Sequence, residues 1–201
     1  MELTRSGTIK AVAILLLLAA ISQPIYTALY LNAPDVDRQI LWGLEALMFV
    51  VLAALAGSAL AMAKRYTLAF SAIGFAAVLN VVQVGVGLVQ FGPARDASQA
   101  GGELAVLAGA IFAFSFFVYY AAKVLLGLAA FVVGMGKMGE GGRLLGGLTA
   151  LVGIVAFSAN TILMMFGRDS FLPSPVAGAS GVVATLLLAI CLFSVASEDG
   201  S

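Results

Sequence analysis

The sequence predicts an all-α, polytopic integral membrane protein whose six transmembrane helices form one compact bundle. Of its 201 residues, 62% are hydrophobic and only 10% are charged, and the mean hydropathy is +1.11. A soluble globular chain carries about 25% charged residues, so lipid rather than water must solvate most of this surface. A second observation agrees with the first, because six apolar runs are each long enough to cross a hydrocarbon core of about 30 Å.

The six predicted helices follow one another with short polar links between them. A spanning helix needs about 20 mostly apolar residues, and the runs of this length cover about residues 9–31, 39–63, 66–91, 104–134, 143–166 and 173–197. Gly92, Pro93 and Pro173 stand at run boundaries, where helices are expected to stop or start. No link is long enough to fold separately, so we expect residues 1–201 to form a single transmembrane domain.

The first run has some features of a signal peptide, namely Arg5 and Lys10 followed by the apolar stretch AVAILLLLAA. Its apolar character continues through Ile25 to Leu31, however, which suits a spanning helix. We therefore expect this run to be retained as the first helix.

Lysine and arginine residues near the helix ends predict the orientation of the chain. The side that holds both termini has more of them than the opposite side, which predicts a multi-pass protein of the cell membrane with both termini in the cytoplasm. The first side carries Arg5, Lys10, Lys64, Arg65, Lys137 and Arg143, and the second carries Arg38, Arg95 and Arg168.

Several classes of chemistry are disfavoured by what the chain lacks. It contains no histidine and one cysteine, Cys191, so the usual ligands for haem, iron–sulfur clusters, copper and zinc are missing. Ten basic residues balance ten acidic ones without a basic cluster, so nucleic acid is not an expected partner. We expect neither a metal site nor a cofactor.

Small residues recur at four-residue spacing in four of the predicted helices. In lipid, such faces allow the close backbone approach on which helix packing depends. They serve either as packing surfaces within the bundle, or as surfaces for a partner subunit or for self-association. The faces comprise Ala53, Gly57 and Ala61; Ala105, Gly109 and Ala113; Thr149 and Gly153; and Ala177, Gly181 and Thr185.

Polar side chains within the predicted spans are the candidates for a binding site. Gln23, Glu45, Gln83 and Asn160 fall at similar depth in the outer half of the bilayer, and Asn80 shares a helix face with Gln83. These positions predict a polar cavity open to the outside, in which Asn80, Gln83 and Asn160 face one another. The alternative is simple hydrogen bonding between helices. Tyr119 and Lys123 of the run 104–134 complete the set. The predicted ligand-binding residues are therefore Gln23, Glu45, Asn80, Gln83, Tyr119, Lys123 and Asn160.

Lys123 is the unusual member of this set, because it lies inside the apolar run 104–134. A charge at the centre of a spanning helix costs roughly 2.5–3.5 kcal/mol on insertion scales. Lys123 could mark the inner membrane interface, with the segment after it continuing along the surface or bending at Gly127. It could instead pair with Glu45, or serve as a functional charge.

These observations favour a small permease or channel-like protein that binds a neutral or weakly polar solute. The alternative is a non-catalytic accessory or assembly subunit of a larger membrane complex. An enzyme that uses Glu45 and Lys123 as acid and base is a third interpretation, and it requires the two side chains within hydrogen-bonding reach. The expected partners are the lipid bilayer, a small solute and other membrane subunits.

Overall fold

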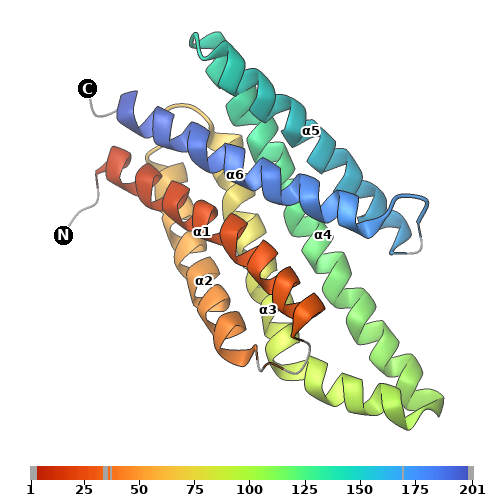
Figure 1. Cartoon of the computed structure of the whole chain (residues 1–201). Coiled ribbons are helices and arrows are strands. Elements are labelled where there is room, and N and C mark those ends of the chain that lie inside the picture. Colours follow the sequence, from red (N-terminus) through yellow and green to blue (C-terminus); the bar gives the residue numbers. More distant parts are fainter. Residues whose placement is uncertain (1–3, 34–35, 37, 169, 199–201) are drawn as a thin grey trace.

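Six α-helices account for nearly all the residues that the computed structural model describes, namely 4–33, 36, 38–168 and 170–198. Each helix is long and apolar enough to cross a membrane, which confirms the predicted fold class. Residues 1–3, 34, 35, 37, 169 and 199–201 of the predicted domain lie outside the described residues. The helices are α1 (Arg5–Asn32), α2 (Gln39–Ala61), α3 (Thr67–Ala100), α4 (Gly102–Gly139), α5 (Arg143–Phe166) and α6 (Ser174–Glu198) (Figure 1).

The third predicted boundary is wrong, because α3 does not stop at Gly92 and Pro93. It continues to Ala100, and Figure 1 shows its last part turning aside from the bundle. Proline lacks an N–H but is tolerated at the start of a helical segment, and the following Ala-Arg-Asp-Ala-Ser-Gln-Ala contains good helix formers. The chain reverses at Gly101 and Gly102, whose φ angles of +78° and +62° favour glycine.

The fourth helix is also longer than predicted. α4 has 38 residues, which corresponds to about 57 Å at 1.5 Å per residue, so it must extend beyond a core of about 30 Å. It continues through Gly127 as regular helix to Gly139. The segment after Lys123 is therefore part of the bundle, and the expected surface segment or bend is wrong.

Five of the helices form a closed ring. α1 packs against α2 and α6, α2 against α3, α3 against α4, and α4 against α6. α5 lies outside this ring, against α4 and α6 (Figure 1). Both termini and the α2–α3 and α4–α5 links lie at one end, which we call the terminal end. The opposite end, where α1 finishes and α6 begins, is called the Ser174 end.

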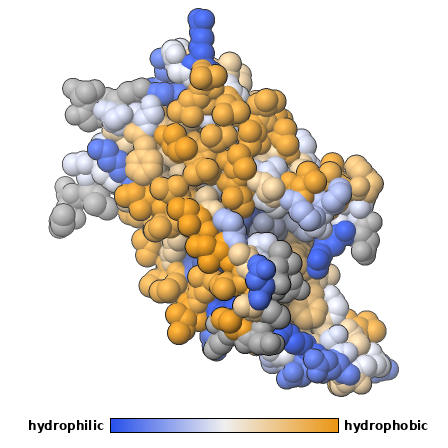
Figure 2. Space-filling view, in the orientation of Figure 1, coloured by the Kyte–Doolittle hydropathy of each residue, from blue (hydrophilic) through white to orange (hydrophobic). Residues whose placement is uncertain are grey.

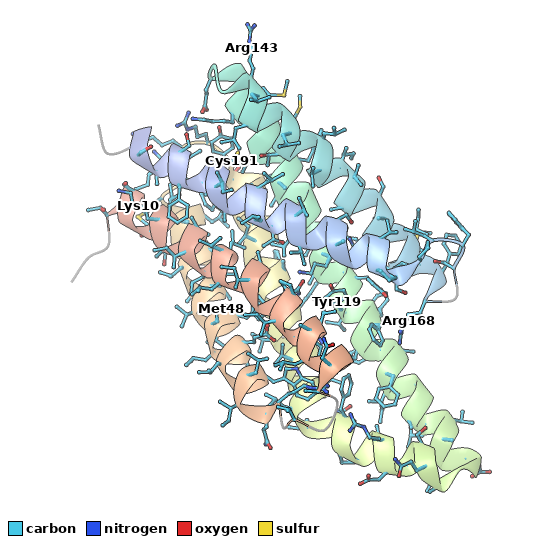
Figure 3. All side chains as sticks on the ribbon, in the orientation of Figure 1. Lys10, Met48, Tyr119, Arg143, Arg168 and Cys191 are labelled. Atoms are coloured by element: carbon cyan, nitrogen blue, oxygen red, sulfur yellow. The ribbon has the colours of Figure 1, made fainter. Side chains whose placement is uncertain are left out.

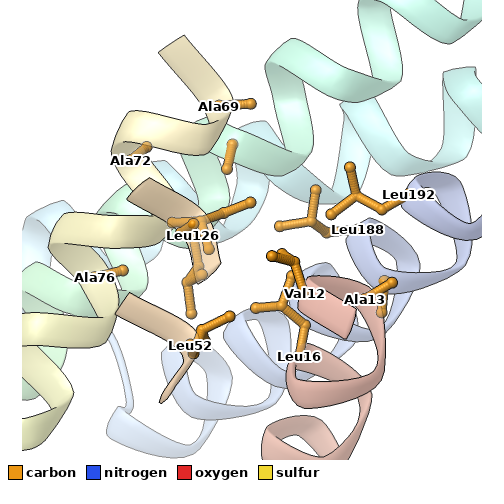
Figure 4. Close-up of a cluster of buried hydrophobic side chains, with 14 of the residues drawn as sticks. Val12, Ala13, Leu16, Leu52, Ala69, Ala72, Ala76, Leu126, Leu188 and Leu192 are labelled. Atoms are coloured by element: carbon orange, nitrogen blue, oxygen red, sulfur yellow. The ribbon is translucent and has the colours of Figure 1, made fainter. Parts of the chain in front are cut away.

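The terminal half of the ring is filled by a hydrophobic core. Side chains from five helices meet there, as Figure 4 shows for Leu16, Leu52, Ala76, Leu126 and Leu188, and each of them is at most 3% exposed. Two polar contacts tie the helix ends of this half together. The Ser6 hydroxyl donates to the Ala196 carbonyl at 2.6 Å. Glu140, in the α4–α5 link, pairs with Arg65 of the α2–α3 link.

Glycines bring α4 and α5 into backbone contact. A Cβ added at Gly127 would lie 2.6 Å from the Phe157 nitrogen, and one at Gly134 would lie 2.4 Å from the Ala150 nitrogen. Gly153 of α5 faces Phe131 just as closely, with 2.5 Å from an added Cβ to the Phe131 nitrogen. The absence of a Cβ at these three glycines therefore allows the backbones of α4 and α5 to pack closely. In lipid there is little hydrophobic drive between helices, so such close packing supplies the energy that holds them together.

The predicted small-residue faces divide into two groups. Thr149, Ala177 and Thr185 are buried in contacts within the bundle. Gly57 and Gly109 are instead exposed, and no heavy atom lies within 4 Å of a Cβ added at either. Gly57 of α2 and Gly109 of α4 are thus not used for packing against the described part of the chain.

Apolar side chains also cover the outside of the bundle. Leu44, Leu47, Val106, Leu144 and Leu151 are all more than half exposed. Figure 2 shows hydrophobic residues across the middle of one face and hydrophilic residues toward its ends. Such a continuous apolar surface is stable in lipid rather than in water, as expected for a membrane-spanning protein.

Candidate functional site

A cavity of about 800 Å³ occupies the half of the ring nearer the Ser174 end. This volume lies within the range of small-molecule sites, roughly 300–1,000 Å³. All of its lining residues in the described part of the chain come from α1, α2, α3, α4 and α6. Along their helices, Asn32 and Ser174 are lining residues nearest the Ser174 end, and Phe49, Asn80 and Val183 are those nearest the terminal end.

Five of the seven predicted binding residues line this cavity, namely Gln23, Glu45, Asn80, Gln83 and Tyr119. They come from four different helices. The fold therefore brings these five predicted residues together. The remaining two, Lys123 and Asn160, do not line the cavity.

Glu45 is held in place by a residue of the neighbouring helix. The Ser22 hydroxyl on α1 donates a hydrogen bond to Glu45 Oε1 at 2.5 Å, and the Glu45 side chain is half-buried. Ser22 was not among the predicted site residues. Its role depends on the pairing of α1 with α2, which residue spacing along one helix does not reveal.

Lys123 lies one helical turn beyond Tyr119, below the floor of the cavity. Its side chain is 3% exposed, and its Nζ lies 5.4 Å from the centre of the Tyr119 ring. Its alkyl chain packs on Gly181 of α6, where an added Cβ would lie 3.0 Å from Lys123 Cδ. The interpretation that Lys123 marks the membrane interface is therefore wrong.

Glu45 and Lys123 are not in direct contact. Glu45 lines the cavity, whereas Lys123 lies outside the lining, against the Tyr119 ring. Among the described residues, the two side chains form neither an ion pair nor a hydrogen bond with each other. The acid–base interpretation required such a contact, and this arrangement does not supply it.

The amide side chains divide into cavity residues and a structural residue. Gln23 and Asn80 line the cavity, and Gln23 Oε1 is buried without a hydrogen-bond partner. Asn160 is fully buried on α5, outside the ring. Its Nδ2 donates to the carbonyls of Ala156 at 2.8 Å and of Ala177 at 3.2 Å. The expectation that Asn160 faces Asn80 and Gln83 is therefore wrong, because its face of α5 packs on α6.

Aromatic rings make up much of the remaining wall, and most of them were not among the predicted site residues. Trp42 packs against Tyr26 and Phe91, with ring centres 5.8 Å apart in both pairs. Phe116 and Tyr120 stack on the opposite wall, with ring centres 6.2 Å apart. The sequence signal that could have identified these rings as site residues was their position in the outer half of the predicted spans.

Two guanidinium groups lie over rings of this wall. Arg38 Cζ lies 5.6 Å from the centre of the Tyr26 ring, and Arg168 Cζ lies 4.2 Å from that of Phe116. Together with Lys123 over Tyr119, three cations thus contact rings that line the cavity.

The cavity extends to the Ser174 end, because its lining includes Asn32, the last residue of α1, and Ser174, the first residue of α6. Figure 1 shows α1 and α6 side by side at the terminal end and diverging toward the other end. Figure 3 shows Tyr119 on α4 between these diverging ends, with Arg168 nearby. The hydrophobic core closes the other end of the ring.

The arrangement suits binding of a small molecule by a mostly apolar wall with a few polar groups. No group of three His, Cys, Asp or Glu side chains able to hold a metal occurs within the described ranges. No protein-family model matches the chain, and the comparisons with curated proteins and with solved structures likewise found no match.

Proposed function

We propose that this protein is a small permease or channel-like membrane protein that binds a neutral or weakly polar solute in the cavity. The observation that carries the proposal is the convergence of Gln23, Glu45, Asn80 and Gln83 from three helices on one apolar-walled cavity. Polar groups in spanning helices are expensive and usually have a reason. Packing alone would account for amides that bond to a neighbouring helix, as Asn160 does.

We further propose that the Ser174 end faces the outside and that both termini lie in the cytoplasm. The excess of Lys and Arg at the terminal end supports this orientation. In this orientation the cavity is open outward and closed inward by the core around Leu16, Leu126 and Leu188. Passage of a solute would then require these side chains to separate.

An uptake assay on the full chain in liposomes tests the proposal, with a panel of radiolabelled neutral solutes. For a solute that is taken up, we expect Gln83→Ala to abolish uptake without changing the elution profile of the protein. The matched control is Gln90→Ala, because Gln90 lies on the same helix but is exposed and outside the cavity lining. Equal loss of uptake in both variants would contradict the proposed site.

One observation favours the second candidate, an accessory subunit of a larger membrane complex. Gly57 and Gly109 leave small-residue faces of α2 and α4 uncovered, and such faces suit docking of another helix. Purification from the native membrane in mild detergent distinguishes the candidates. A stoichiometric protein partner identified by mass spectrometry supports the subunit, and elution of the chain alone supports the permease.

A further inference from the structure

We infer that the solute carries a basic amine on an apolar body, and that Glu45 binds this amine in competition with Lys123. The inference rests on the proposed binding cavity. The inferred solute differs from the proposed neutral solute in one respect. Its single polar group is a protonated amine.

The Glu45 carboxyl group is the first support. It lies in a spanning helix and faces the cavity, and one of its oxygens accepts the Ser22 hydroxyl. Within the described residues, no other hydrogen bond or ion pair reaches this side chain. Its second oxygen is therefore left for a donor inside the cavity, and a carboxyl group binds an ammonium donor especially strongly.

Gln23 is a second polar residue of the cavity lining. Its Oε1 is buried without a hydrogen-bond partner. A buried acceptor without a donor is unfavourable. An ammonium group has three donors, so after bonding to Glu45 it retains donors for other acceptors of the lining.

The aromatic wall is the third support. Rings attract cations over their faces. Three rings of this cavity, Tyr26, Phe116 and Tyr119, already lie against Arg38, Arg168 and Lys123 of the protein itself, so a bound cation would have to use another ring. The Trp42 ring also lines the cavity, and tryptophan is the strongest cation-binding ring. An apolar body with one ammonium group matches both the rings and the acceptors.

Lys123 acts as the resident counter-charge. It is buried against the Tyr119 ring of the cavity, and no ion pair joins it to Glu45 within the described part of the chain. When the cavity is empty, Lys123 partly balances Glu45 through space. A bound amine would take over this role and would be repelled by Lys123, so removal of the lysine should strengthen amine binding.

Three probes with one phenyl body and different charge test the inference on the full-length protein in detergent. These are 2-phenylethylamine (cation), 2-phenylethanol (neutral) and 3-phenylpropanoate (anion), and their affinities are measured by calorimetry. We expect the wild type to bind the amine about tenfold more tightly than the alcohol, as one charge-assisted hydrogen bond would provide. Glu45→Gln should remove this preference, and Lys123→Met should increase it.

Each outcome bears on the inference. Amine binding no tighter than alcohol binding in the wild type overturns it, and so does tightest binding of the anion; neither result requires a variant to fold. An amine preference that survives Glu45→Gln, or that falls in Lys123→Met, also overturns it. If the alcohol binds and the amine binds no better, the inference fails while the proposed neutral-solute site stands. If no probe binds, the inference fails, and the uptake assay alone decides the proposed function.

Discussion

At the scale of single residues, two amides predicted at similar depth have different environments. Asn160 joins α5 to α6 through the Ala177 carbonyl, whereas Gln83 is half-buried in the cavity wall. Interhelical hydrogen bonds in membranes contribute about 0.6 kcal/mol on average and up to about 1.7 kcal/mol. The first residue should therefore matter for stability and the second for binding.

We predict that Asn160→Ala lowers the free energy of unfolding by about 0.6–1.7 kcal/mol, because the bond between α5 and α6 is lost. Gln83→Ala should leave it nearly unchanged. Unfolding by SDS in mixed micelles, followed by circular dichroism, measures both. A larger loss for Gln83→Ala than for Asn160→Ala would contradict these roles.

Residue spacing alone identified five cavity residues but misplaced two. Depth along a span can be counted from hydropathy, so Gln23, Glu45 and Gln83 were expected at one level, and all three line the same cavity. Which neighbour each helix face contacts cannot be counted in this way. Asn160 was misplaced because α5 lies outside the ring, and Lys123 because the neighbouring Gly181 gives its side chain space within the bundle.

At the scale of helices, close glycine contacts determine how α4 and α5 pack. Gly134 shows this most clearly, because an added Cβ would lie 2.4 Å from the Ala150 backbone nitrogen. The neighbour is backbone and not a flexible side chain. The two helices must therefore separate if Gly134 is enlarged.

We predict that Gly134→Ala lowers the free energy of unfolding by about 1–3 kcal/mol, the usual cost of overpacking. The matched control is Gly109→Ala on the same helix, where no heavy atom lies within 4 Å of the added Cβ. This control should retain or raise stability, since alanine is the better helix former. Similar destabilisation by both would show that α4 and α5 do not pack as described.

Helix number was predictable from the sequence, whereas two helix ends were not. The apolar runs are long relative to a bilayer, so six spans follow from composition. Gly92 and Pro93 are ordinary stop signals, but helix formers follow them and the true break falls at Gly101 and Gly102. The positive φ angles at these glycines occur where the folded chain reverses direction. The sequence shows only that glycine would permit such a reversal at this point.

At the scale of the whole molecule, the ring of five helices is divided into two halves. One half holds the cavity, and the other holds the core that includes Leu16, Ala76 and Leu188. This asymmetry is the basis of the proposed outward-open binding site. The positions of Gln23, Glu45 and Gln83 predicted a cavity in one half of the spans. The core that fills the other half could not be predicted, because it depends on which helix faces meet.

Cysteine labelling in intact cells tests the central claim most directly. The one native cysteine, Cys191, is 0% exposed, so the wild type should react little with a membrane-impermeant maleimide. Gln83→Cys should be labelled from outside, while Ala76→Cys, about two turns deeper on α3, should not. Lys64→Cys, exposed in the α2–α3 link, should react only after permeabilisation. Labelling of Ala76→Cys as fast as Gln83→Cys, or labelling of Gln83→Cys only after permeabilisation, would contradict an outward-facing cavity closed by the core.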